Sequence, residues 1–207
     1  MPARRVLLLL CVPVLIAVTA ACPVETVYPG DVVVGTFNFN ARVDWARTTC
    51  DAGSPNFKGT ADGGFTFAGT FSRDSVDGGA WFTVDGYSRR ATYTAETQTF
   101  DSPHTAGAKL PSCESTCEGS KIEEGMRVMV LSESQDERIA SKCVNLGDGG
   151  VPTGEGVTPP APTVNGYDAV RTCGELKVTF IPSETASCKC QPGCAAVYSV
   201  EGTRRFQ

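Results

Sequence analysis

The sequence contains a single histidine, His104, among its 207 residues. This scarcity excludes metal centres built from several histidines. No G-x-S-x-G segment is present, which excludes the nucleophile elbow of the α/β-hydrolases. Asp101, Ser102 and His104 stand close together, but the members of a hydrolytic triad converge from separate segments. We therefore expect His104 to be a solvent-exposed loop residue, and we predict no catalytic residues.

Basic residues are outnumbered as well, with 18 Lys and Arg against 23 Asp and Glu, for a net charge of −5. An acidic chain lacks the basic patch that nucleic acid needs, so no nucleic-acid partner is expected. The Asp-Gly pairs stand alone rather than in a D-x-D-x-D-G array. They predict turns rather than calcium loops. No metal and no cofactor are predicted.

Only one long apolar run is present, and it lies near the N-terminus. Arg4 and Arg5 precede the apolar residues 6–18, and Ala20 and Ala21 follow them. A positive region, a short apolar region and a small-residue exit are the plan of a secretory signal peptide. The run is shorter than the roughly 20 residues that a membrane-spanning helix needs.

The end of this segment, VTAAC (18–22), places small residues directly before a cysteine. It resembles the lipobox of bacterial lipoproteins, although Thr19 stands where an aliphatic residue is most common. The resemblance covers residues 1–22 only. It implies cleavage after residue 21 and lipidation of Cys22, which would become the first residue and anchor the protein in a membrane. Removal of the first 21 of the 207 residues would leave 186 and would take the net charge from −5 to −7, because Arg4 and Arg5 leave.

The number of cysteines agrees with lipidation. Cys11 leaves with the signal peptide, and if Cys22 carries lipid an even number remains for disulfides outside the cytoplasm. The alternative is an ordinary secretory cut, which would leave one thiol unpaired. The predicted disulfide cysteines are Cys50, Cys113, Cys117, Cys143, Cys173, Cys188, Cys190 and Cys194. Their pairing is left open, since eight cysteines allow about 105 connectivities.

Alternation of apolar and polar residues dominates the rest of the chain. In residues 37–45 the side chains of Phe37, Phe39, Ala41, Val43 and Trp45 share one face, and residues 65–71 repeat the pattern. This period of two predicts half-buried strands, of which we expect about seven to nine in all, with almost no helix. The predicted fold is an all-β, disulfide-stapled antiparallel β-sandwich, with a small β-barrel as the alternative.

The expected organisation is a signal peptide over 1–21, a tether over 22–30 and a single β-domain over 31–207. Residues 147–166 are rich in Gly and Pro and predict a long exposed loop. Residues 101–120 are interpreted as a second, cysteine-bearing loop. We expect the strands of the C-terminal region 167–207 to join the main sheet, because two strands alone bury little surface.

Several residues could carry chemistry, and each has a structural alternative. Cys173, Cys188, Cys190 and Cys194 could bind zinc, but an oxidising compartment favours disulfides. Glu123 and Glu124 are adjacent, so they point to opposite faces of a strand and are interpreted as a solvated strand entrance. The aromatic residues of the first strands are interpreted as core. Trp81 is out of phase with Phe82 and is the candidate binding aromatic.

These patterns favour a cell-envelope lipoprotein with a non-catalytic structural, adhesion or binding role. Its expected partners are a membrane, reached through the lipid, and an envelope protein. Pro23 follows the lipidation site where an aspartate retains some lipoproteins at an inner membrane, which favours the outer membrane. An envelope hydrolase with a site not visible in the sequence, or a cysteine-rich inhibitor or ligand-capturing module, remains an alternative.

Overall fold

Eight β-strands make up the regular secondary structure of the part of the chain that the structure describes. The computed structural model describes residues 27–51, 57–59, 63–75, 78–95, 97–111, 116–132, 169–184 and 193–205. The strands are β1 (Val32–Val43), β2 (Gly64–Arg73), β3 (Gly79–Val84), β4 (Tyr87–Thr94), β5 (Thr99–Pro111), β6 (Thr116–Ser132), β7 (Ala169–Ile181) and β8 (Cys194–Arg204).

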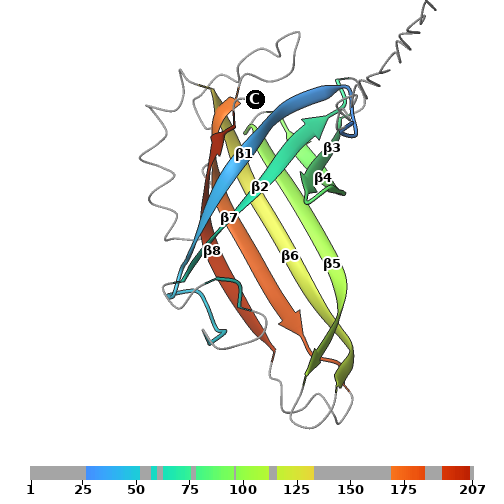
Figure 1. Cartoon of the computed structure of the whole chain (residues 1–207), viewed down its shortest axis with the longest axis vertical. Helices are drawn as coiled ribbons and strands as arrows, with labels where there is room; N and C mark the ends of the chain where they lie inside the picture. Colours follow the sequence, from blue (N-terminus) through green and yellow to red (C-terminus); the bar gives the residue numbers. More distant parts are fainter. Residues whose placement is uncertain are drawn as a thin grey trace, which may run out of the picture.

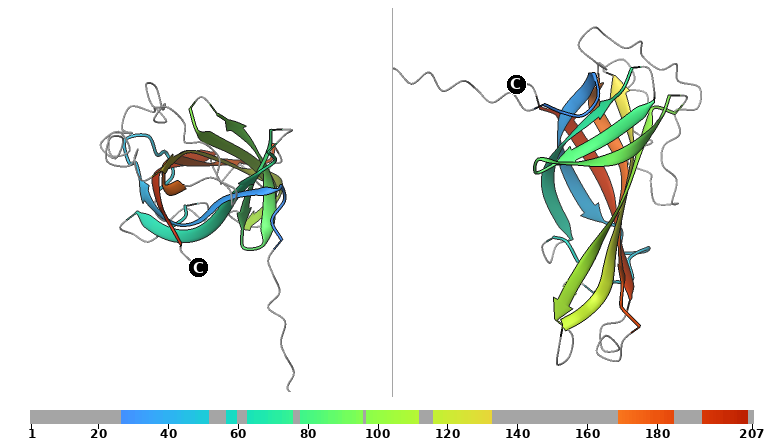
Figure 2. Two further views of the ribbon diagram at one scale, coloured as in Figure 1. Left: turned by 90° about the horizontal axis from the view of Figure 1, so that it is seen from above. Right: turned by 90° about the vertical axis from the view of Figure 1, so that its right-hand side faces the viewer.

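The strands form one closed antiparallel barrel in sequence order (Figure 1). Each strand pairs with the next, and β8 returns to pair with β1 from Phe37↔Arg204 to Val43↔Tyr198. The view from above in Figure 2 shows the strands arranged around a ring. The all-β prediction is confirmed, and the structure has the barrel rather than the sandwich. The reason is the β1–β8 pairing, which joins the eight strands into a single closed sheet instead of two stacked ones.

Strand β1 shows the predicted alternation. Phe37, Phe39 and Ala41 are buried, whereas the residues between them are exposed. The inward face of the strand is therefore the one that the sequence indicated. The strand ends at Val43, so Trp45 lies beyond it and is 51% exposed, stacked on Phe57 with ring centroids 5.4 Å apart. The prediction that Trp45 continues the buried face is wrong for this reason.

The hairpin between β3 and β4 turns at Asp85-Gly86, as the Asp-Gly pair predicted. Both residues have positive φ, 50° for Asp85 and 80° for Gly86. Two consecutive positive φ values fit the twist of a two-residue hairpin, and Asp-Gly is among the pairs best suited to them. The turn therefore fixes the register from Val84↔Tyr87 to Gly79↔Thr92.

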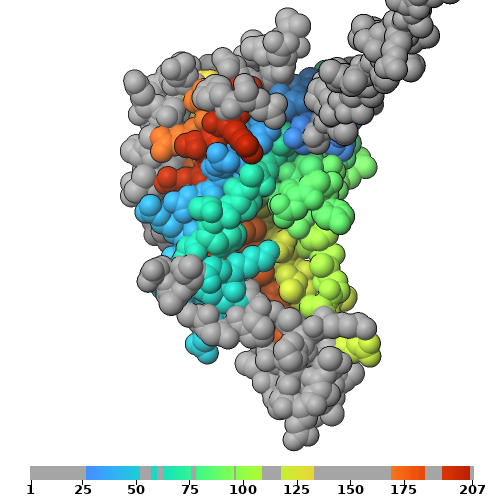
Figure 3. Space-filling view, viewed as in Figure 1, coloured from blue at the N-terminus to red at the C-terminus, as the bar shows by residue number. Residues whose placement is uncertain are grey.

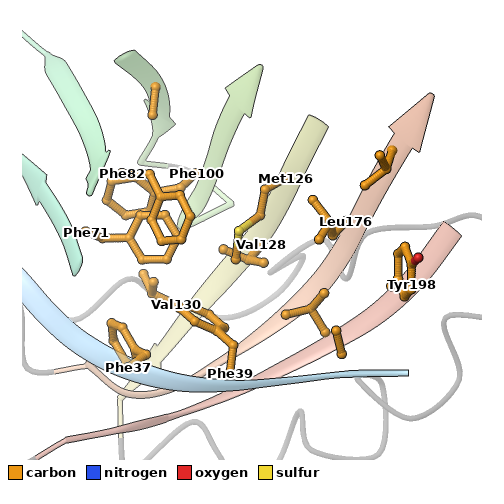
Figure 4. Close-up of a cluster of buried hydrophobic side chains, with 14 of the residues drawn as sticks. Phe37, Phe39, Phe71, Phe82, Phe100, Met126, Val128, Val130, Leu176 and Tyr198 are labelled. Atoms are coloured by element: carbon orange, nitrogen blue, oxygen red, sulfur yellow. The ribbon is translucent and has the colours of Figure 1, made fainter. Parts of the chain in front are cut away.

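Aromatic side chains fill one end of the barrel (Figure 4). The Phe71 ring lies 4.5 Å from the Phe82 ring and 4.6 Å from the Phe100 ring, measured between centroids. Gly69 makes room for this stack, because a Cβ there would come within 2.5 Å of Phe82. Burial of each such ring stabilises the fold by roughly 1.5–3 kcal/mol. The predicted core role is confirmed for Phe37, Phe39 and Phe71, which are fully or almost fully buried.

The interpretation of residues 101–120 as a loop is wrong. Most of them belong to β5 and β6, which pair from Thr99↔Met129 to Pro111↔Thr116, and the lower end of this long hairpin projects beyond the hairpin of β3 and β4 (Figure 2, right). His104 is accordingly a half-buried strand residue. Pro103 and Gly107 obscured the strand pattern. Proline is tolerated here because β5, beyond its three pairs with β4, is bonded only to β6.

The C-terminal strands β7 and β8 belong to the main sheet, as expected. Strand β6 contains a continuous buried stretch. Its residues Val128–Leu131 are fully buried, and Met129 and Leu131 pack with Cys173 in a second, smaller cluster.

Two of the predicted disulfide cysteines pair with each other, Cys50 with Cys194. This bond links the start of the β1–β2 connection to the first residue of β8. Cys173 is disulfide-bonded as well. The other predicted disulfide cysteines lie outside the described residues or side chains: Cys113, Cys117, Cys143, Cys188 and Cys190. The same holds for Cys22, for the tether up to residue 26 and for the predicted loop 147–166.

Candidate binding site in the barrel wall

A short hairpin leaves one side of the barrel wall open. Strands β3 and β4 have 6 and 8 residues, whereas β5, β6 and β7 have 13, 17 and 13. Strand β3 pairs with β2 only from Thr70 onward, and three pairs, Thr92↔Asp101 to Thr94↔Thr99, join β4 to β5. Among the described strands, the first half of β2 and most of β5 therefore have no neighbour on this side. Figure 3 shows the wall hollowed here, between the cyan residues of β2 and the yellow residues of β6.

The opening leads to a cavity of about 190 Å³ inside the barrel. Its apolar lining comes from four strands and consists of Phe65, Phe67, Phe82, Val84, Met126 and Leu176. Its polar lining consists of Lys58, Asp85, Arg89, Ser102 and Glu124. An apolar wall with a few converging polar groups is the usual composition of a small-molecule site. An eight-stranded barrel is just wide enough to be filled by side chains or to hold one small ligand.

Glu124 ties together the three edges of the opening. It projects inward from β6, and its side chain is only 12% exposed. One carboxylate oxygen accepts a hydrogen bond from Lys58, which lies between β1 and β2, and the other accepts one from Arg89 Nη1 at 2.5 Å. We call Lys58, Arg89 and Glu124 the clasp. It connects the β1–β2 segment, the β3–β4 hairpin and the opposite wall.

The charge state of the clasp follows from its contacts. Burial alone raises the pKa of Glu124, but the hydrogen bonds and positive charges of Lys58 and Arg89 outweigh burial and lower the pKa. Glu124 is therefore a carboxylate at neutral pH. The prediction that Glu123 and Glu124 face opposite ways is confirmed, since Glu123 is exposed. The prediction that Glu124 is solvated is wrong, because β6 begins well before it and carries it into the wall.

The segment around Lys58 is held against the barrel by further contacts. The backbone N–H of Lys58 donates to Tyr198 Oη at 2.9 Å, and the Phe57 ring lies 6.0 Å from the Tyr198 ring. Burial raises the pKa of the Tyr198 phenol despite that hydrogen bond. Tyr198 is thus a neutral, fully buried anchor for residues 57–59 at the edge of the opening.

Ser102 is the unusual member of the cavity lining. It is 3% exposed, and its Oγ has no hydrogen-bond partner within the described part of the chain. Buried polar atoms in folded proteins are nearly always paired, and an unpaired hydroxyl costs about 1–3 kcal/mol. An unpaired hydroxyl in the wall of a cavity is available to a ligand.

The residues singled out in the sequence are placed as follows. Trp81 lies on the face opposite Phe82, as predicted, but it is only partly exposed. Its ring packs over Gly30 and Gly79, where an added Cβ would come within 3.0 and 2.9 Å of it. Its binding role stays a prediction. Asp101 points away from Ser102 and His104, because adjacent strand residues face opposite sides, so the three form no triad.

Sequence reasoning considered Ser102 and Glu124 but assigned neither to a site, and it did not consider Lys58 or Arg89. One signal was present for two of them. Glu124 continues the inward series of Met126, Val128 and Val130, and Ser102 continues that of Phe100. A polar residue in phase with a buried series is a candidate for an inward site. Lys58 lies in the β1–β2 connection and Arg89 in the β3–β4 hairpin. Their positions at the site depend on how these segments are placed in the fold, which no periodic sequence pattern predicts.

Within the described ranges, no three His, Cys, Asp or Glu side chains are grouped so as to hold a metal ion. The same part of the chain contains no helix long and apolar enough to cross a membrane. No family model matches the chain, and no curated protein matches it significantly.

Proposed function

We propose that this protein is a non-catalytic binding module of the cell envelope, tethered by a lipid on Cys22, that holds a small ligand in the cavity of its barrel wall. The observation that carries the proposal is the cavity itself. It combines an aromatic wall with a buried serine hydroxyl that has no partner among the residues that the structure describes. A ligand with an apolar body and one hydrogen-bonding group would satisfy both features.

The size of the cavity sets the scale of the ligand. A dry apolar cavity of about 150 Å³ is large enough for benzene. The volume here, about 190 Å³, therefore suits a single ring or a short alkyl group. Phe65 and Phe67 stack on each other with centroids 5.6 Å apart, and their ring faces offer contact area to a flat ligand.

The charge state of Glu124 favours a binding function over hydrolysis. Two carboxylates, Asp85 and Glu124, line the cavity. Glu124 is engaged by two cations that lower its pKa, and a general acid or base works best with a pKa near the operating pH. The clasp is thus better suited to position a ligand than to transfer a proton to it.

The anchoring part of the proposal rests on residues 1–22. The tether of residues 22–30 can span at most about 30 Å, so a lipid on Cys22 would keep the barrel close to the membrane surface. To test it, the wild type and Cys22→Ser are expressed in a bacterium and fractionated, and the N-terminal peptide is read by mass spectrometry. Diacylglycerol on Cys22 and loss of membrane association in the variant are expected. An unmodified Cys22 would refute anchoring.

The ligand site is tested with a pair of serine variants. Ser72 and Ser102 are both buried with an unpartnered Oγ, but Ser102 alone lines the cavity. Ser102→Ala and Ser72→Ala should each leave the free protein as stable as before or slightly more stable. Calorimetric titration with benzyl alcohol should show binding that weakens about fivefold or more in Ser102→Ala and is unchanged in Ser72→Ala. Equal affinities in all three proteins would contradict the site.

A further inference from the structure

A second hollow adjoins the cavity on the outside of the wall. It measures about 890 Å³ and lies where β4 separates from β5. Val84, Asp85 and Arg89 line both this cleft and the inner cavity. The two spaces therefore meet at the β3–β4 hairpin, and one ligand can occupy both. A molecule with its apolar part inside would place its other end in the cleft.

The cleft is basic on a protein that is acidic as a whole. Arg89 and Arg90 line it, and Asp85 is the one acid among its described lining residues. The net charge of the chain is −5. Two arginines against one acid give the cleft a local excess of positive charge, which raises the local concentration of anions. This distribution indicates an anionic group on the ligand.

Arg89 is placed to bind that group. Its guanidinium carries five N–H donors, and among the described residues its one hydrogen-bond acceptor is Glu124. The side chain is 28% exposed, at the junction of cavity and cleft. The remaining donors can bind a carboxylate in the two-pronged geometry that suits a guanidinium.

We infer that the ligand is a small amphipathic carboxylate, with its ring or short alkyl part in the cavity beside Ser102 and its carboxylate on Arg89 in the cleft. This inference rests on the proposed binding function and names the chemical class of the ligand. The contacts are reversible and involve no covalent step.

A matched pair of probes tests the proposed carboxylate contact separately from the proposed binding of an apolar group in the cavity. 3-Phenylpropionate and 3-phenylpropan-1-ol share the same apolar body and differ in the anionic end. Calorimetric titration of the wild type should show about tenfold tighter binding of the carboxylate at low salt, because a charge-assisted hydrogen bond is added. Added salt should reduce this preference, since exposed charges are screened.

Two variants identify the residues. Arg89→Gln should reduce the preference for the carboxylate to about twofold or less while the alcohol still binds, and Arg90→Gln should reduce it partly. Arg42→Gln, an exposed arginine on β1 with the same change of charge, is the control and should leave the preference intact.

The outcomes differ for the two proposals. If neither probe binds, the proposed binding function fails together with this inference. If both bind with equal affinity, the binding function stands and the anionic class is wrong. A preference for the carboxylate that persists in Arg89→Gln, or that is insensitive to salt, would overturn the assignment to Arg89. Because the salt series uses the wild type, the inference remains testable even if Arg89→Gln does not fold.

Discussion

The two ends of the barrel interior differ in how their walls are closed. At the end around Phe71, every neighbouring pair of strands is bonded, and rings from β2, β3 and β5 fill the space at centroid distances of 4.5–4.6 Å. At the end around Glu124, the hairpin of β3 and β4 is too short to complete the wall, and an ionic clasp spans the gap. One region is closed by backbone pairing and packing, and the other by three side chains. The comparison shows how the length of one hairpin decides where a barrel is solid and where it is accessible.

The largest difference between the ends should appear on removal of a packed ring. Phe71→Ala should lower the free energy of unfolding by about 3–5 kcal/mol, because Phe71 is fully buried between two other rings. Urea unfolding followed by circular dichroism measures this. Phe65→Ala, at the edge of the opening and only half-buried, serves as the comparison and should cost clearly less. Equal costs at the two positions would show that the open end is packed as tightly as the closed one.

The clasp should respond to pH as well as to mutation. Glu124→Gln should lower the free energy of unfolding by about 1–2 kcal/mol at pH 7, because Lys58 and Arg89 lose their shared carboxylate. The folded pKa of Glu124 lies below its unfolded value of about 4.3, so its contribution is present above that value. It is lost as the pH falls through the folded pKa.

Urea midpoints measured from pH 7 to pH 3 test this. In the acidic part of that range, the wild type should no longer be more stable than Glu124→Gln. Glu123→Gln, the exposed neighbour, is the control and should track the wild type. A constant gap between the wild type and Glu124→Gln down to pH 3 would argue against a lowered pKa.

The smallest effect concerns the hairpin that separates the two regions. Gly86→Ala should cost about 1 kcal/mol, because φ is 80° there while no atom of the described residues lies within 4 Å of an added Cβ. The cost is therefore conformational rather than steric. Thermal unfolding measures it. Gly107→Ala, a strand glycine in equally open surroundings without a positive φ, should change the stability less. The reverse order would mean that the turn tolerates alanine.

The closed end could be predicted from the sequence and the open end could not. Phe37, Phe39 and Ala41 alternate so regularly that their strand and its inward face follow from the pattern alone. The choice between sandwich and barrel depends on whether β1 meets β8, a contact between residues far apart in the chain that no local period encodes. The clasp likewise depends on a contact between residues far apart in the chain. Lys58 and Glu124 are 66 residues apart, and only the closed sheet brings them together.

The bond between Cys50 and Cys194 changes the connectivity of the molecule. Neighbouring strands of the barrel follow one another directly in the sequence except the first and the last, and this disulfide lies beside the seam between those two. Residues 50–194 therefore form a covalent ring. A single proteolytic cut anywhere within it opens the ring without releasing a fragment, and β8 stays attached to the N-terminal segment. At the proposed location in the envelope, one nick would leave the barrel joined to the end of the chain that carries the proposed anchor.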